Sequence, residues 1–538
     1  MRSIVDVGKD VGLGAGDLEL YGKYAAKIPL ESLKGRDRKG KLILITAMTP
    51  TPFGEGKTTT AIGLSMAFKR LGVNSIVCVR QPSLGPVFGV KGGATGGGAS
   101  QVVPAADINL HFTGDIDAVS SAHNLLSAMI DNHIFQGNTL GIDPAKITWP
   151  RTVDMNDRAL RSIMVAQGSN TLRQDRFVIT AASEVMAILA LSLDYVALKE
   201  KLGRIVIGLS KTEKPVTADS LHAAGAMSAL LSNALKPNLV QTLEESPALV
   251  HGGPFGNIAH GTCSLLSILS ALSLADYAVV ECGFASDLGA EKFFNIVCRL
   301  GALTVDAVVI VATIRALKHH GGVSKEKIDE PDAASVEKGL PNLAKHIENM
   351  KKFGLRPIVV LNRFSKDNQE EVRTVINFCE SQGVEISTST VFEEGGKGAV
   401  ELAQTVIASA KRPAKNKLLY ESSWPVKQKI ETIVREIYGG NGVKYTEQAE
   451  QDLKLLNEFG FNNLPICVAK TQLSLSDNPK LLGRPTGFDV SVGRAIASAG
   501  AGFNVIHMGD IMTMPGLPKQ PAAERVDIDE LGHVHGLT

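Results

Sequence analysis

TAMTPTPFGEGKTTT, residues 46–60, stands between a short apolar run at 42–46 and a helical pattern at 58–71. In that pattern large apolar residues recur at helical spacing, and Gly72 follows as a cap. A strand, a Gly-rich turn and a helix in this order predict a phosphate-binding loop. The alternative is an ordinary Gly-rich turn between a strand and a helix.

The side chains of this loop suit a nucleotide. Gly54 and Gly56 let the backbone wrap closely around an anion, and the helix N-terminus supplies N–H donors. Lys57 is expected to reach the β- and γ-phosphates, and the Thr58 hydroxyl is expected to bind Mg²⁺. Thr51 stands where the common pattern has its first glycine. The predicted nucleotide-binding residues are Thr51, Pro52, Phe53, Gly54, Glu55, Gly56, Lys57 and Thr58.

Short apolar runs alternate with helical patterns along the rest of the chain. The runs are almost continuously apolar, which is typical of parallel strands covered on both faces. They predict an α/β fold with a doubly wound, mostly parallel sheet, and smaller α/β domains toward the C-terminus. The expected strands are 42–46, 75–79, 204–209, 277–281, 307–312 and 357–361.

Composition excludes several function classes. Lys and Arg number 56 against 55 Asp and Glu, so a net charge of +1 gives no general reason to expect a surface for nucleic acid or an anionic membrane. The apolar runs 264–275 and 185–193 are shorter than the ~20 residues of a membrane helix. The start, MRSIVDVGKD, lacks the apolar segment of a signal peptide. Six cysteines without CxxC spacing predict reduced thiols in a cytoplasmic enzyme.

A second Gly-rich stretch, RQPSLGPVFGVKGGATGGG at 80–98, follows the expected strand 75–79. Arg80 stands at the carboxyl end of that strand, where open α/β sheets bind their ligands. Its planar guanidinium suits a carboxylate or an acyl phosphate, and Gly-rich backbone can donate several N–H groups to an anion. A flexible surface loop is the alternative.

Two further strand ends carry polar or aromatic groups. YAVVECGFASDLGAE at 277–291 places Glu281 at a strand end, where an acid can support Mg²⁺ or position water, although a solvated turn is the alternative. PIVVLNRF at 357–364 places Asn362 where its amide can contact a base and Phe364 where its ring can stack. A core phenylalanine is the alternative for Phe364.

Ordered segments along nearly the whole chain resemble the formate–tetrahydrofolate ligase family. They are TPFGEGKTTT (51–60), GVKGGATGGG (89–98), DINLHFTGD (107–115), HGGPFGNIAHG (251–261), GFASDLGAEKF (283–293), VATIRALKHHGG (311–322), LLGRPTGF (481–488) and GDIMTMPGLPK (509–519). The resemblance implies a cytoplasmic carbon–nitrogen ligase, a homotetramer, that uses MgATP to join formate to tetrahydrofolate. The implied products are 10-formyltetrahydrofolate, ADP and phosphate, formed through formyl phosphate.

The resemblance also implies roles for individual residues. Lys57, Arg80 and Asp115 are expected to be catalytic, and Thr58 is expected to orient Mg²⁺. The expected formyl-phosphate-binding residues are Arg80, Gly96, Gly97 and Phe284, and the expected folate-binding residues are Phe364 and Phe392. Three units are expected: a nucleotide- and formyl-phosphate-binding α/β domain at 1–350, a second α/β domain with the folate pocket at 351–508, and a C-terminal segment at 509–538 packed on the core.

The chain departs from the family pattern beside that chemistry. Gln81 stands where the family has a Glu associated with activation by a monovalent cation. The other departures are Ala99 and Leu473 for Tyr, Phe392 for Trp, Glu393 and Glu394 for Ala and Lys, and Ser365 for Pro. These departures motivate one alternative, a paralogue that binds ATP or folate without coupled turnover. The phosphate loop leaves a second, a scaffold or switch ATPase that hydrolyses ATP without formate.

Overall fold

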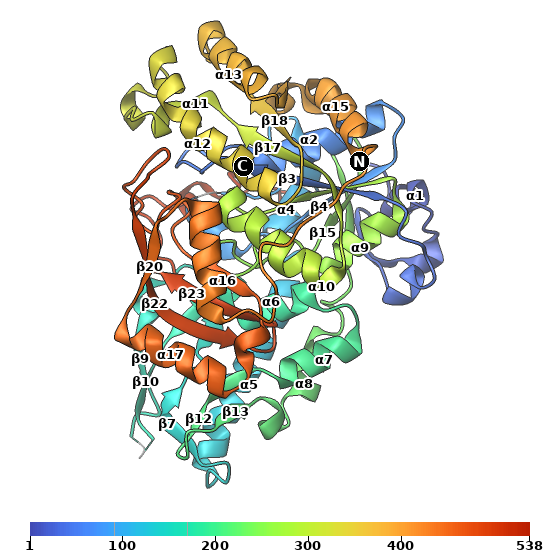
Figure 1. Ribbon diagram of the computed structural model, residues 1–538. Coiled ribbons are helices and arrows are strands. Elements are labelled where there is room, and N and C mark those ends of the chain that lie inside the picture. Colours follow the sequence, from blue (N-terminus) through green and yellow to red (C-terminus); the bar gives the residue numbers. More distant parts are fainter. Residues whose placement is uncertain (91, 169–170, 510, 538) are drawn as a thin grey trace.

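The computed structural model describes residues 1–90, 92–168, 171–509 and 511–537, and its centre is one large mixed sheet (Figure 1). Within these residues the sheet is 12-stranded, and β5 (Gly96–Gly97) and β6 (Ser100–Val103) lie off its main path. The main path runs in the order β1 (Glu19–Tyr21), β2 (Ala25–Lys27), β14 (Asn238–Thr242), β15 (Pro247–Val250), β4 (Ser75–Val79), β16 (Tyr277–Glu281), β3 (Lys41–Ala47), β17 (Val305–Ala312), β18 (Pro357–Asn362) and β19 (Glu385–Ser389).

The strands from β15 to β19 are all parallel, so their carboxyl ends share one edge. Five of the predicted strands lie in this parallel part, and the predicted fold class is confirmed. The expected strand at 204–209 was wrong as a member of this sheet. It is β12 (Val206–Ser210), in a separate antiparallel sheet with β7 (Ile142–Ile147) and β13 (Pro215–Thr217). A short apolar run indicates burial but does not choose the partner strand.

Helices cover both faces of the large sheet. Alternate side chains of β3 point to opposite faces, so they enter two different cores. Ile43 and Ile45 pack in one core with α2 (Lys57–Arg70) and α15 (Val400–Ala410). Leu42 and Leu44 join a second core with α9 (Leu265–Leu274) and α12 (Ala333–Lys352). The remaining longer helices are α1 (Ile4–Asp10), α5 (Asp115–Phe135), α6 (Glu184–Leu191), α7 (Tyr195–Gly203), α8 (Ala224–Leu231), α11 (Ile314–His320), α13 (Gln369–Ser381), α16 (Val426–Ile433) and α17 (Glu447–Glu458).

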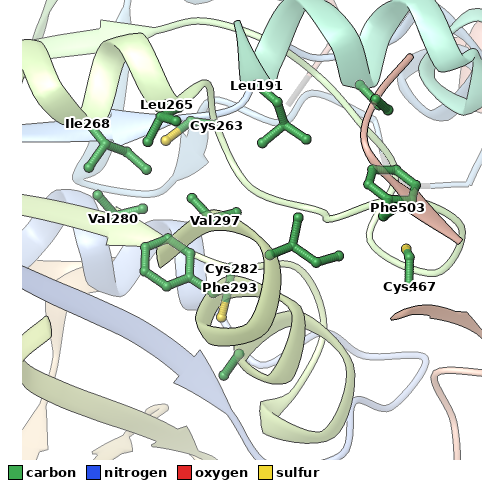
Figure 2. Packing of buried hydrophobic residues seen from close by; sticks show 14 of the residues in the cluster. Leu191, Cys263, Leu265, Ile268, Val280, Cys282, Phe293, Val297, Cys467 and Phe503 are labelled. Carbon is green, nitrogen blue, oxygen red and sulfur yellow. The ribbon is translucent and has the colours of Figure 1, made fainter. Parts of the chain in front are cut away.

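A smaller mixed sheet lies toward the C-terminus, in the orange and red part of Figure 1. Its order is β20 (Gly442–Tyr445), β22 (Asp489–Ser498), β23 (Phe503–Met508) and β21 (Ile466–Ala469). Figure 2 shows Phe503 and Cys467 of this sheet directed toward the same buried region as Leu191 of α6, and all three belong to one hydrophobic cluster. The small sheet therefore shares a core with the rest of the chain.

The sheet topology bears on the expected boundary between residues 350 and 351. That point lies inside α12 (Ala333–Lys352), in its last turn, and the strands that follow, β18 and β19, continue the large sheet. The small sheet begins only at Gly442. The three-part division stays a prediction, and the strands alone would place a boundary later. No helix among the described residues combines the length and apolar character needed to cross a bilayer.

Candidate active site

The site lies at the carboxyl edge of the parallel strands. The predicted phosphate loop leaves β3 there and enters α2, and Glu281 ends the neighbouring strand β16. Arg80 follows β4, which pairs with the other side of β16. The strand order β4–β16–β3 therefore places three predicted polar side chains, which are far apart in the sequence, along one edge. This is where open α/β sheets bind ligands.

Two glycines shape the loop. Gly54 and Gly56 have φ values of 77° and 73°, in the left-handed region that favours glycine. A Cβ added to Gly56 would also lie 2.5 Å from the Nδ2 atom of Asn362, at the end of β18. That amide donates to the Glu55 carbonyl at 3.3 Å. The Asn362 side chain therefore packs against Gly56 and binds the loop backbone at Glu55.

The Glu55 side chain joins two parts of the loop by accepting hydrogen bonds from Thr51. Its Oε1 atom accepts the Thr51 backbone N–H at 2.6 Å and the Thr51 hydroxyl at 3.0 Å. The side chain is buried, and burial raises the pKa of its carboxyl above the usual value, while the charge of Lys57 opposes that rise. Thr51 thus has a definite partner at the position where the common pattern has glycine.

Glu281 links the loop to Arg80. The Thr58 hydroxyl donates to Glu281 Oε2 at 2.7 Å, and Arg80 Nη2 lies 3.8 Å from Glu281 Oε1. Arg80 also donates from Nη1 to the Pro254 carbonyl at 3.3 Å. Lys57 lies half-buried beside Thr58, at the first position of α2. A carboxylate and a hydroxyl on neighbouring elements are the oxygen donors that Mg²⁺ prefers.

Glycine loops surround the Arg80 guanidinium. The Gly283 N–H donates to the Gly261 carbonyl at 2.7 Å, and a Cβ on Gly283 would lie 3.3 Å from Arg80 Nη1. A Cβ on Gly261 would lie 2.4 Å from the Gly256 Cα. Phe284 follows directly, with φ of 60°. The Gly283 backbone therefore lies beside Arg80, and the 251–261 loop forms a wall next to it. The expected role of Phe284 toward formyl phosphate stays a prediction.

Gly96 and Gly97 lie elsewhere on the same edge. They form β5, which pairs with β6, and a Cβ on Gly97 would lie 3.1 Å from the Phe392 ring and 3.9 Å from Thr59 Oγ1. These glycines therefore lie between the first turn of α2 and α14 (Val391–Glu394), against the predicted folate residue Phe392. Their expected role toward formyl phosphate stays a prediction.

Phe364 and Phe392 follow neighbouring strands, because Asn362 of β18 is paired with Ser389 of β19. The Arg315 guanidinium lies 5.1 Å from the centre of the Phe364 ring, and Phe392 is 44% exposed. Two aromatic rings near one sheet edge, one of them open to solvent, can accept a planar ligand.

Glu394, beside Phe392, is held by Lys397 at 2.6 Å and by the Thr390 hydroxyl at 2.6 Å. These contacts lower the pKa of its carboxyl, and Lys397 offsets its negative charge. Glu393 is exposed. The acidic departures near Phe392 therefore add less net negative charge than the sequence alone indicates.

Asp115 occupies a separate, closed environment. Its Oδ1 accepts Lys27 Nζ at 2.8 Å and its Oδ2 accepts Asn238 Nδ2 at 2.7 Å, all three residues being buried. The structure shows no direct contact of Asp115 with Lys57 or Arg80. Its catalytic role stays a prediction.

A cavity of about 540 Å³ opens near the site, at the carboxyl ends of the parallel strands β21 and β23. Asn257 lines it from the 251–261 loop, and the segment from Lys470 to Pro479 lines it from the small sheet. None of the expected catalytic or ligand-binding residues lines this cavity or lies in the wall formed by residues 251–261. The glycines of HGGPFGNIAHG were the available signal, since close backbone approach requires them.

A parallel sheet with ligand-binding groups gathered at its carboxyl edge defines an α/β enzyme of the nucleotide- or anion-binding class. The family model described as formate–tetrahydrofolate ligase matches residues 1–538, so the chain belongs to this family. It is accordingly an ATP-binding carbon–nitrogen ligase of folate one-carbon metabolism.

Proposed function

We propose that this chain joins formate to tetrahydrofolate through formyl phosphate, using the edge formed by Lys57, Thr58, Arg80 and Glu281. The observation that supports it most directly is the contact of Glu281 with both the Thr58 hydroxyl and the Arg80 guanidinium. These side chains come from three neighbouring strand ends and offer cations and oxygen ligands over a few ångströms.

In the first step, formate oxygen attacks the γ-phosphorus of MgATP and ADP leaves. The loop 51–58 binds the phosphates, and Lys57 neutralises the charge that develops on them. Thr58 and Glu281 would hold Mg²⁺, which would draw charge from the phosphate oxygens when bound. Such reactions depend mainly on positioning and charge stabilisation.

In the second step, the folate amine attacks the formyl carbon, and phosphate leaves from the tetrahedral intermediate. Arg80 has one guanidinium nitrogen, Nε, that is buried without a hydrogen-bond partner among the described residues. A planar guanidinium with a free donor suits an acyl phosphate bound at two oxygens. Phe284 forms the neighbouring wall, and Phe364 and Phe392 flank the folate ring.

The proposal includes a cytoplasmic homotetramer and a monovalent cation as a further cofactor. Gln81 is buried, and its Oε1 has no hydrogen-bond partner among the described residues. A neutral amide attracts a cation less than a carboxylate does. Titration of activity with K⁺ tests this part, and the mass of the protein in solution tests the tetramer.

The deciding measurement is ADP release with MgATP and tetrahydrofolate, with and without formate. Strict dependence on formate and a 10-formyl product support the ligase. ADP release without formate would support the switch ATPase instead, and nucleotide binding without turnover would support the altered paralogue. Lys69→Ala is a matched control for variants of Lys57, because Lys69 lies in the last turn of the same helix.

A further inference from the structure

Two buried side chains bridge the phosphate loop to the 470–483 segment of the small-sheet region. The bridge joins Thr49, two residues after β3, to Gly483. Its members are His320 at the end of α11 and Asn342 in α12, and both are buried. None of the proposed steps uses them.

Asn342 makes contacts to both ends. Its Nδ2 donates to Thr49 Oγ1 at 2.9 Å and to the Gly483 carbonyl at 2.7 Å. Its Oδ1 accepts the Thr49 N–H at 3.3 Å. One amide thus binds the backbone and hydroxyl of Thr49 together with the backbone of Gly483.

His320 makes the second link, and its partners determine its tautomer. Nε2 lies 2.9 Å from the Thr49 carbonyl, which can only accept, and Nδ1 lies 3.1 Å from the Gly483 N–H, which can only donate. The ring is therefore neutral with its proton on Nε2. Burial lowers the pKa of His320 to about 4, in agreement with this state.

The far end of the bridge leads to the 540 Å³ cavity. The Ser474 hydroxyl donates to the Leu481 carbonyl at 2.6 Å, which ties the chain before Gly483 to the segment that lines the cavity. Lys470, at the start of that segment, is buried in an ion pair with Asp287 at 2.9 Å.

We infer that His320 and Asn342 are positioning residues that couple the phosphate loop to the 470–483 segment. The inference rests on the proposed binding of MgATP to the loop. Ordering of the loop by MgATP then orders Gly483, and by linkage an ordered segment strengthens binding of MgATP.

The test is hydrogen exchange of peptides covering 48–58 and 481–488, with and without MgATP. We compare the unchanged protein with His320→Leu, which removes both bonds, and His320→Gln, which can keep one donor and one acceptor. His319→Leu is the matched control on the same helix. Steady-state KM values for ATP and formate are measured in parallel.

We expect MgATP to slow exchange in both peptides of the unchanged protein, the Gln variant and the control. In His320→Leu the protection of 481–488 is lost, and the KM for ATP rises about tenfold while that for formate changes less than twofold. Protection of 48–58 alone in the unchanged protein would overturn the coupling but keep the nucleotide site. Protection of neither peptide would overturn both.

If His320→Leu fails to fold, Asn342→Ala replaces it, because this variant removes the parallel link. Full protection of 481–488 by MgATP in whichever of these two variants folds would overturn the inference. A fall in thermal stability with unchanged exchange coupling would assign the bridge a structural role only.

Discussion

Two buried carboxylates, Asp115 and Glu281, show how differently one chain uses the same group. Asp115 is 3% exposed, and both oxygens are engaged by buried partners, Lys27 and Asn238. Glu281 is 4% exposed, but its partners Thr58 and Arg80 are only partly buried, and Arg80 lies 3.8 Å away. A buried pair with every oxygen engaged is costly to break, whereas a carboxylate with a distant, partly exposed cation beside it retains capacity for a ligand.

The largest effect is expected at the open edge. Lys57→Ala should lower formate-dependent ADP release about 10³-fold or more, equal to ~4 kcal/mol of transition-state stabilisation. The unfolding temperature should hardly change, because the side chain is half-buried at a helix start. ADP release and calorimetry check this, and Lys69→Ala should keep full activity. Equal losses in both variants would contradict the loop assignment.

Asp115→Asn tests the fully paired, buried carboxylate of this comparison. It leaves the Lys27 ammonium buried without its counter-charge, so the free energy of unfolding should fall by ~3–5 kcal/mol. Activity per folded molecule should stay close to normal if the closed pair is structural only, and should fall if the predicted catalytic role holds. Denaturant titration measures the first quantity and initial rates the second. The double variant Lys27→Met with Asp115→Leu should recover part of the stability. Lost turnover with unchanged stability would instead support a catalytic Asp115.

Glu281→Gln, at the open edge, should lower activity, whereas Asp115→Asn lowers stability. The amide keeps an acceptor for the Thr58 hydroxyl but removes the charge, so kcat/KM should fall about 10²-fold, or ~3 kcal/mol. The requirement for Mg²⁺ should rise. Asp306→Asn is the matched control, because Asp306 accepts the Leu42 N–H at the other end of β3. An unchanged Mg²⁺ requirement in Glu281→Gln would argue that Glu281 only positions Arg80.

The smallest effect is expected at Phe392, the exposed ring that follows β19. Phe392→Trp enlarges the exposed ring, and the KM for tetrahydrofolate should fall about threefold, within the ~0.5–1.5 kcal/mol of an aromatic pair. The KM for ATP should not change. A fall in both constants would indicate a general repacking against Gly97 rather than a direct contact with folate.

Much of the fold could be predicted from local patterns. The strands around β3 and the helix α2 lie within a residue or two of their expected bounds. The run at 204–209 failed because apolar character does not specify a partner strand. Glycines and strand ends pointed to the loop and to Arg80, and the family resemblance pointed to Phe284; their roles stay predictions. The neighbours of Gly97 and the bridge through His320 depend on long-range pairing.

The sequence by itself determined the local elements: a strand, a glycine loop with Lys57, and the helix that follows. Spacing and backbone freedom act over a few residues, so they can be read locally. Only the tertiary structure decided that Glu281 lies between Thr58 and Arg80 and that Asp115 lies in a closed pair. Those outcomes follow from strand order and helix packing, which join residues far apart in the chain and leave no short-range signal.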